Sequence, residues 1–178
     1  AGQPPLYSDT RIVDDNNQPV AAGERGEICL RGPNIMKGYW NRPDATAEAI
    51  DAQGWFHSGD VGYLDEDGFL FICDRLKDMV ISGGENVYPA EVEGALYKHD
   101  AIAEVAVIGL PDDKWGEAVT AVVALHEGQS LTLDELRDFA ESLLARYKLP
   151  LRLHVVDALP RNPAGKVLKF VLKEQLAD

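Results

Sequence analysis

The sequence changes character at residues 75–78, and this change constrains the fold more than any other feature. Before it, apolar runs such as GEICLRG (26–32) and YLDEDGFLFICD (63–74) alternate with turns, which indicates strands and hairpins. After it, helix signals are interleaved with strand-like runs. We therefore predict an α+β fold. A β-rich segment would span 1–74, and a small mixed α/β domain with a central sheet flanked by helices would span 75–178.

Three local signals define individual elements. Gly68 follows three acidic residues and can supply the positive φ that a hairpin turn within 63–74 needs. Pro89 stands where the first turn of a helix tolerates a proline. Thr132 and Glu135 form a capping box, and the helix that they begin is expected to run to Pro150. Its predicted apolar stripe consists of Leu136, Phe139, Ala140, Leu143, Leu144 and Tyr147.

Composition excludes several classes of protein. The chain has 178 residues, 46% of them hydrophobic, which is enough for one mid-sized domain or two small ones with packed cores. Its net charge of -13 disfavours binding to nucleic acid or to an anionic membrane surface. From Arg146 to Lys173, however, seven Lys or Arg residues accompany one acid. This basic stretch suits a small anion, and it is also compatible with a solvated helical face.

The cysteines and the apolar runs indicate in which cellular compartment the protein is expected. Cys29 and Cys73 lie in strand-like settings and do not make a disulfide framework, so we expect a reducing cytoplasm. The chain has no secretory pattern and no apolar run near the length of a membrane span.

Four segments carry groups suited to nucleotide chemistry. Asp60 could accept two hydrogen bonds from a ribose diol, and Arg75 offers a fork of donors to hydroxyl or phosphate oxygens. The pair Gly83 and Gly84 would let the backbone approach a ligand closely. Lys166 follows a glycine in a turn-rich loop, where an ammonium could neutralise developing charge. Taken singly, each segment also fits an ordinary turn or a solvated surface residue.

The order of the segments is more specific than any one of them. HSGD, DRLKDM, ISGGENVYPAEVE, PDDKWGE, YKLP and PRNPAGK follow one another along the chain. This series resembles the acyl-adenylate-forming enzymes, and within them the acyl-CoA synthetase branch of fatty-acid and aryl-acid CoA ligases. The resemblance runs from about Arg11 to the last helix. It implies only the last third of such an enzyme, because the family's Ser/Thr/Gly-rich phosphate loop and its aromatic-Gly-x-Thr-Glu motif are absent.

The resemblance implies roles for individual residues. Asp60 would bind the ribose hydroxyls of ATP or AMP, Arg75 would contact the same nucleotide, and Lys77 would be the hinge. Lys166 would be catalytic, touching carboxylate and phosphate oxygens during adenylation. The passage for the pantetheine arm of CoA would be lined by Ser82, Gly83, Gly84, Glu85 and Trp115.

It also implies cofactors and partners. These are ATP or AMP, CoA, a small carboxylic acid (a fatty acid is favoured) and a missing N-terminal domain that would hold Mg²⁺, with no metal site in this chain. The chain alone would be inactive, and a lysine acetyltransferase could modify Lys166. Two alternatives stay open. One is an adenylation domain that loads a carrier protein, although ISGGENVYP favours free CoA. The other is a non-catalytic module that binds only a nucleotide or a protein partner.

Overall fold

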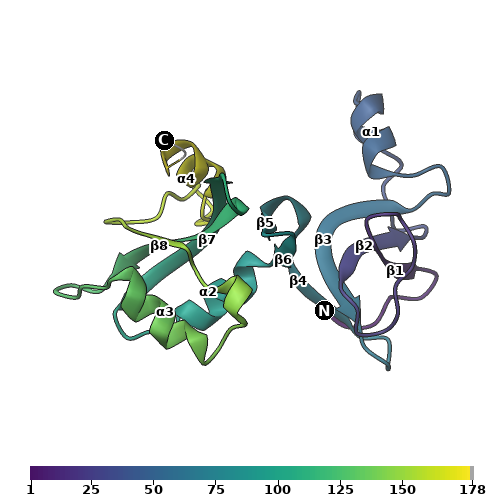
Figure 1. Ribbon diagram of the computed structural model, residues 1–178. Coiled ribbons are helices and arrows are strands. Elements are labelled where there is room, and N and C mark those ends of the chain that lie inside the picture. Colours follow the sequence, from purple (N-terminus) through teal and green to yellow (C-terminus); the bar gives the residue numbers. More distant parts are fainter. Residues whose placement is uncertain (177–178) are drawn as a thin grey trace. The chain divides into compact units, whose positions relative to one another are not determined.

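The computed structural model describes residues 1–176 and divides into two compact units, Ala1–Lys77 and Asp78–Asp178 (Figure 1). The division falls within the 75–78 segment. Each unit has its own sheet and its own buried side chains, so each is described by itself. The predicted α+β class is confirmed.

The first unit is an antiparallel sheet in the order β1-β2-β3-β4, with one helix in a connection. Its elements are β1 (Asp9–Val13), β2 (Gly26–Arg31), α1 (Pro43–Ala49), β3 (Phe56–Leu64) and β4 (Leu70–Arg75). The expected hairpin of residues 63–74 joins β3 to β4, and Gly68 in its turn has a φ of 79°. This conformation is accessible to glycine at little cost, which explains why the chain reverses there.

Trp55 anchors the core of the first unit. It is buried together with Val13 and Cys29. The guanidinium groups of Arg11 and Arg31 lie 4.2 Å and 4.4 Å from the centroid of its ring. Cations on an indole face are stabilised by the ring quadrupole, so two arginines help close a small core that few aliphatic side chains fill.

The second unit has a five-stranded sheet in the order β6-β5-β8-β7, and β9 pairs in parallel with β8. Its elements are a 3₁₀ turn η1 (Leu76–Asp78, at the division), β5 (Val80–Ser82), β6 (Glu85–Val87), α2 (Pro89–Leu96), β7 (Ile102–Asp112), β8 (Gly116–Leu125), α3 (Leu133–Glu141), η2 (Arg146–Lys148), β9 (Arg152–Val155) and α4 (Lys169–Leu176). As predicted, Pro89 is the first residue of a helix, α2.

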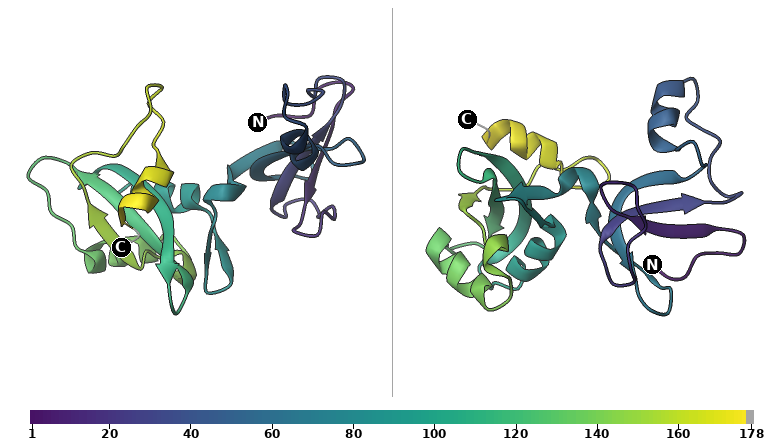
Figure 2. Two further views of the ribbon diagram at one scale, coloured as in Figure 1. Left: turned by 90° about the horizontal axis from the view of Figure 1, so that it is seen from above. Right: turned by 45° about the vertical axis from the view of Figure 1, so that its right-hand side comes forward.

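Side chains of β7 and β8 alternate between two buried clusters. Val107 and Val119 belong to the larger cluster, which α2 and α3 complete through residues such as Leu96 and Leu136. Ile108 and its neighbours belong to a smaller cluster that Leu172 of α4 completes. Strand alternation therefore gives the sheet two apolar faces, and helices cover both of them (Figures 1 and 2).

The predicted length of the helix after Thr132 was wrong. The capping box is present, but α3 ends at Glu141, and Ala145 then adopts an extended conformation. This break turns the chain, so that Leu149 enters the core and the Lys148 ammonium reaches the Glu91 carboxylate. Two members of the predicted stripe, Leu143 and Tyr147, are exposed as a result; Leu136, Ala140 and Leu144 are buried.

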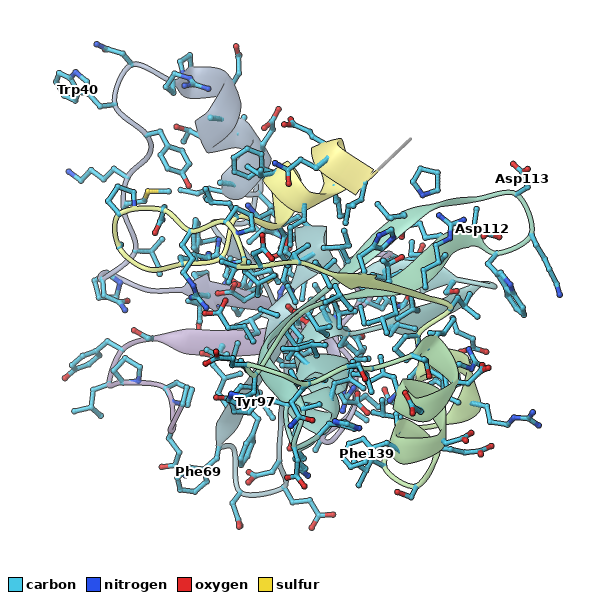
Figure 3. All side chains as sticks on the ribbon, turned by 90° about the vertical axis from the view of Figure 1, so that its left-hand side faces the viewer. Trp40, Phe69, Tyr97, Asp112, Asp113 and Phe139 are labelled. Carbon is cyan, nitrogen blue, oxygen red and sulfur yellow. The ribbon has the colours of Figure 1, made fainter. Side chains whose placement is uncertain are left out.

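Several large apolar side chains point outward from both units, among them Trp40, Phe69 and Tyr97 (Figure 3). The longest helix of residues 1–176 has nine residues. Within that range, no helix has both the length and the apolar character required of a membrane span.

Candidate functional site

Asp60 lies on an irregular part of β3. Cys29 pairs with His57 and Glu27 pairs with Val61, so Ser58, Gly59 and Asp60 stand opposite Ile28 alone. We call residues 58–60 the bulge. Gly59 has a φ of 70°, in the left-handed region that favours glycine. Bulges redirect side chains and occur frequently beside functional sites.

Arg75 faces Asp60 across the β3–β4 ladder. The two residues are register partners, and Arg75 Nε lies 3.5 Å from Asp60 Oδ1. Their side chains are 50% and 33% exposed, so both retain access to solvent. The carboxylate can accept two hydrogen bonds from a diol while the guanidinium donates to neighbouring oxygens. The two residues predicted to bind nucleotide are therefore adjacent, and their binding role remains a prediction.

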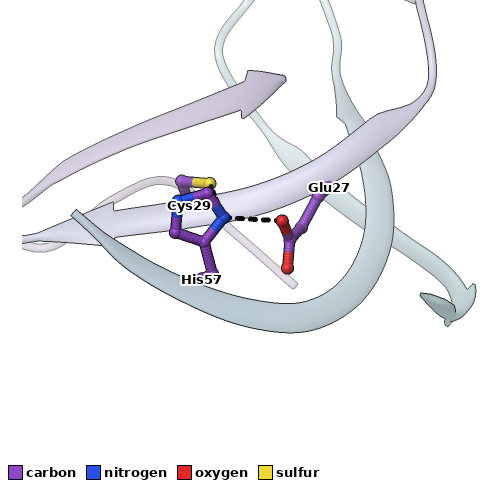
Figure 4. A group of neighbouring side chains, drawn as sticks. All are labelled: Glu27, Cys29 and His57. Carbon is purple, nitrogen blue, oxygen red and sulfur yellow. Dashed lines mark hydrogen bonds and ion pairs between the residues drawn. The ribbon is translucent and has the colours of Figure 1, made fainter. Parts of the chain in front are cut away.

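Glu27, Cys29 and His57 form a partly buried group beside the bulge (Figure 4). Each offers one ligand atom, and these atoms lie within 4.8 Å of one another, as a metal site would require. However, Glu27 Oε2 and Cys29 Sγ both already contact His57 Nδ1, at 2.6 Å and 3.5 Å. Burial, and after it the neighbouring Glu27 carboxylate, raise the pKa of the Cys29 thiol to about 11. A metal ligand must be a thiolate, so the group favours internal hydrogen bonding over metal binding.

The two predicted glycines form the turn between β5 and β6. Ser82 pairs with Glu85, and Gly83 and Gly84 between them have φ values of 63° and 85°. Two successive positive φ angles define the type I′ turn of a two-residue hairpin. The Gly83 amide donates to the carbonyl of Trp115, 2.8 Å away. Gly83 therefore lies against the tryptophan that the resemblance grouped with it.

Trp115 belongs to the connection between β7 and β8. Asp112, at the end of β7 (Figure 3), accepts hydrogen bonds from the backbone amides of Lys114 and Trp115. These bonds, followed by the Arg152 guanidinium, hold the pKa of Asp112 below its ordinary value. An ionised Asp112 therefore orders the turn that presents Trp115, a residue that is 38% exposed.

A pocket of about 330 Å³ opens beside this turn. It is lined by Ser82, Trp115, Arg137, Arg146, Tyr147, Leu149 and Leu151. Apolar walls with two guanidinium groups suit a narrow ligand that carries negative charge. The sequence prediction named Ser82 and Trp115 but missed both arginines. Arg146 belongs to the basic stretch, and Arg137 lies before it on α3. Three other residues of the predicted passage, Gly83, Gly84 and Glu85, do not line the pocket.

Lys166 lies in an ordered loop. The Asn162 side chain accepts hydrogen bonds from the amides of Ala164 and Lys166, and the Asn162 amide donates to the Lys166 carbonyl. Arg161 donates to the carbonyl of Gly165, whose φ is 81°. The loop therefore holds the backbone of Lys166 while its side chain is exposed. Lys77, the predicted hinge, lies in η1 at the division between the units.

Two family models match the chain. Residues 91–166 match the AMP-binding enzyme C-terminal domain, and residues 1–40 match the AMP-binding enzyme family. The chain is 50% identical to a feruloyl-CoA synthase of an Amycolatopsis species over 95% of its length. It is 49% identical to a 2-succinylbenzoate–CoA ligase of Geobacillus sp. (strain WCH70) over 100%, and 46% identical to a long-chain-fatty-acid–CoA ligase of Mycobacterium tuberculosis over 98%.

These alignments cover 34%, 36% and 34% of the relatives, so the chain spans about a third of the length of the curated relatives it matches. Among solved structures, ATP-bound MatB from Rhodopseudomonas palustris matches with a TM-score of 0.92 and 38% identity, over 100% of this chain and 36% of that one. The chain thus belongs to the AMP-binding enzyme family of adenylate-forming enzymes, in which it matches the C-terminal portion of the CoA ligases.

Proposed function

We propose that this chain is the C-terminal portion of an AMP-forming acid–thiol ligase, which joins a carboxylic acid to CoA through an acyl adenylate. The observation that carries the proposal is the pairing of Asp60, in the bulge, with Arg75, in a chain whose relatives are named as CoA ligases. A carboxylate for a ribose diol, next to a guanidinium for neighbouring oxygens, fits ATP and AMP.

The first half-reaction would use Lys166. A carboxylate oxygen of the acid attacks the α-phosphorus of ATP, the bond to the β-phosphate bridging oxygen breaks, and pyrophosphate leaves. Negative charge on the reacting oxygens would be neutralised by the exposed ammonium of Lys166, which its ordered loop presents. Mg²⁺ and the pocket for the acid are assigned to the N-terminal domain, beyond the matched third of the relatives.

The second half-reaction would use the β5–β6 turn. The CoA sulfur attacks the acyl carbonyl, the thiol proton leaves and AMP departs. A turn of two glycines beside Ser82 and Trp115 gives a thin thiol arm access along the backbone. The guanidinium groups of Arg137 and Arg146 suit the phosphate groups at the far end of CoA. Because both half-reactions need residues of the second unit, we infer that this unit turns about Lys77 between them.

The relatives named above act on aromatic and on long-chain acids, so the substrate class of this chain is a carboxylic acid, with a fatty acid as the favoured member. Cys29 and Cys73 lie in strands of the sheet and make no disulfide framework, which fits a reducing cytoplasm. The exposure of Lys166 makes it accessible to an acetyltransferase, and acetylation would remove its charge. Mass spectrometry of the native protein that never detects acetyl-Lys166 would reject this modification.

The decisive experiment is Lys166→Ala in the complete ligase that carries this chain. We expect adenylation to slow by about 10²–10³-fold, because a group that stabilises developing charge is lost. Thioester formation from preformed acyl-AMP should change far less. Lys98→Ala removes another exposed lysine of the second unit and should leave both rates unchanged. The measurement is pyrophosphate release for the first step and single-turnover CoA transfer for the second.

Equal losses in both half-reactions would reject the catalytic role of Lys166. The 178-residue chain alone should catalyse no ATP–pyrophosphate exchange, and measurable exchange would contradict the assignment of the acid pocket to another domain. Replacing CoA by a carrier protein as the acceptor tests the carrier-loading alternative directly.

A further inference from the structure

The bulge that carries Asp60 is held from the β2 side by one carboxylate. Because three residues of β3 stand opposite one residue of β2, the regular ladder cannot pair every peptide group there. Glu27, on β2, supplies the missing acceptor. Its Oε1 accepts from the backbone amide of Gly59 at 3.1 Å, and its Oε2 accepts from His57 Nδ1 at 2.6 Å.

His57 is hydrogen-bonded at one nitrogen of its ring, and the other nitrogen lies near a second carboxylate. A carboxylate only accepts hydrogen bonds, so Nδ1 carries the hydrogen that it donates to Glu27. Nε2 faces the Asp51 carboxylate at 3.8 Å. Asp51 is itself held by Arg11 at 3.3 Å and by the amides of Gln53 and Trp55. A connected series of side chains therefore runs from the Trp55 core to the peptide that precedes Asp60.

This arrangement is shielded from water. The side chains of Glu27 and His57 are 17% and 22% exposed, less than Asp60 at 33% and Arg75 at 50%. Hydrogen bonds to a charged group gain strength when they are removed from water. At the bulge itself, the Asp60 amide bonds to Ser58 Oγ, which belongs to the same short loop. The Glu27 bonds instead tie the bulge to a neighbouring strand.

We propose that Glu27 and His57 are positioning residues for the nucleotide ribose. They would act by holding Gly59 so that the Asp60 carboxylate meets the ribose diol, without touching the nucleotide themselves. This inference rests on the proposed function, since it takes Asp60 as the group that binds the diol. It assigns a task to the Glu of GEIC and to the His of HSGD, two segments that lie thirty residues apart.

The test is nucleotide binding to the complete ligase that carries this chain. Calorimetric titration with AMP is compared with titration with 2′,3′-dideoxy-AMP, which has no diol. We expect Glu27→Ala to weaken AMP binding by about tenfold to hundredfold, the effect of a small misplacement of a binding group. Binding of the dideoxy analogue should not change. Glu27→Gln, which retains the shape and one acceptor oxygen, should give a smaller loss, and it replaces the alanine variant if that one does not fold.

Four further variants separate the possible explanations. Glu48→Ala removes an exposed acid of α1 and should bind both ligands normally. Asp60→Ala should weaken AMP binding, and Glu27→Ala added to it should have no further effect, because the two changes remove the same interaction. His57→Gln should also weaken AMP binding selectively.

The outcomes are distinguishable. If Asp60→Ala leaves AMP binding unchanged, the diol role in the proposed function fails. If Asp60→Ala weakens binding but folded Glu27→Ala and Glu27→Gln bind AMP like the parent, the positioning role is overturned. Equal weakening of AMP and its dideoxy analogue would also overturn it, because it would indicate a general structural effect.

Discussion

Gly83 and Gly84 are neighbours in one turn, but their surroundings differ. Both have positive φ, so any larger residue would be strained at either position. A Cβ on Gly83 would also lie 2.9 Å from Trp115 Cε3, a distance that real contacts essentially never show. A Cβ on Gly84 would meet nothing within 4 Å. The first glycine is therefore required by conformation and by contact, the second by conformation alone.

Gly84→Ala should lower the free energy of unfolding of the chain by about 1–2 kcal/mol, the usual cost of a left-handed conformation. Gly83→Ala should lower the free energy of unfolding by more, because the Trp115 ring must also move. The measurement is urea denaturation of both variants, repeated with Trp115→Ala. In the Trp115→Ala background, the two glycine variants should lower the free energy of unfolding by equal amounts. A persistent difference would mean that Trp115 is not the neighbour that excludes a side chain at Gly83.

At the scale of elements, α3 shows what a cap can and cannot specify. Thr132 Oγ1 accepts from the Glu135 amide, and Glu135 Oε2 accepts from the Thr132 amide, so both halves of the capping box are formed. The hydrogen bonds from Thr132, first from its hydroxyl and then from its amide, hold the pKa of Glu135 below its ordinary value. The cap determines where the helix begins and has no influence on where it ends.

Thr132→Ala should lower the free energy of unfolding by about 1 kcal/mol at neutral pH. Thr132→Ser keeps the hydroxyl and should retain most of the stability. The pKa of Glu135 is lower in the folded state, so its stabilising effect is present above the ordinary value of 4.5 and is lost as pH falls through the folded pKa. Urea denaturation should therefore show that Thr132→Ala lowers the free energy of unfolding by less in acid than at neutral pH. An equal penalty at both pH values would exclude the Glu135 half of the box.

At the scale of the whole molecule, the chain consists of two units with separate cores, and Lys77 is the last residue of the first. The proposed reaction cycle requires the backbone there to change conformation. Hinge residues absorb such changes through their φ and ψ angles, and proline removes the freedom of φ.

Lys77→Pro in the complete ligase should therefore impair thioester formation much more than adenylation. Lys77→Ala removes the same charge but leaves φ free, and it should support both half-reactions. The two rates are measured separately, with preformed acyl-AMP as the substrate of the second. A proline variant with an unimpaired second step would locate the hinge elsewhere.

Local chemistry accounts for what the sequence predicted correctly. The hairpin at Gly68, the helix that begins at Pro89 and the capping box of Thr132 each depend on a few consecutive residues. The end of α3 does not. It follows from the entry of Leu149 into the core and from the contact of Lys148 with Glu91 on α2, which a helical continuation to Pro150 would prevent. Periodicity alone carried no sign of that contact.

The residues of the candidate nucleotide site fall into two groups, those that would contact the nucleotide and those that hold the bulge. The sequence by itself determined the order of the motifs and the family. It also identified Asp60, Arg75 and Lys166 as candidates, because the residue types within a short motif indicate which chemistry it can support. Only the tertiary structure decided that Glu27 and His57 lie beside Asp60. Their contact depends on the register of β2 against β3, and register is set by the packing of the whole sheet, which no short segment encodes.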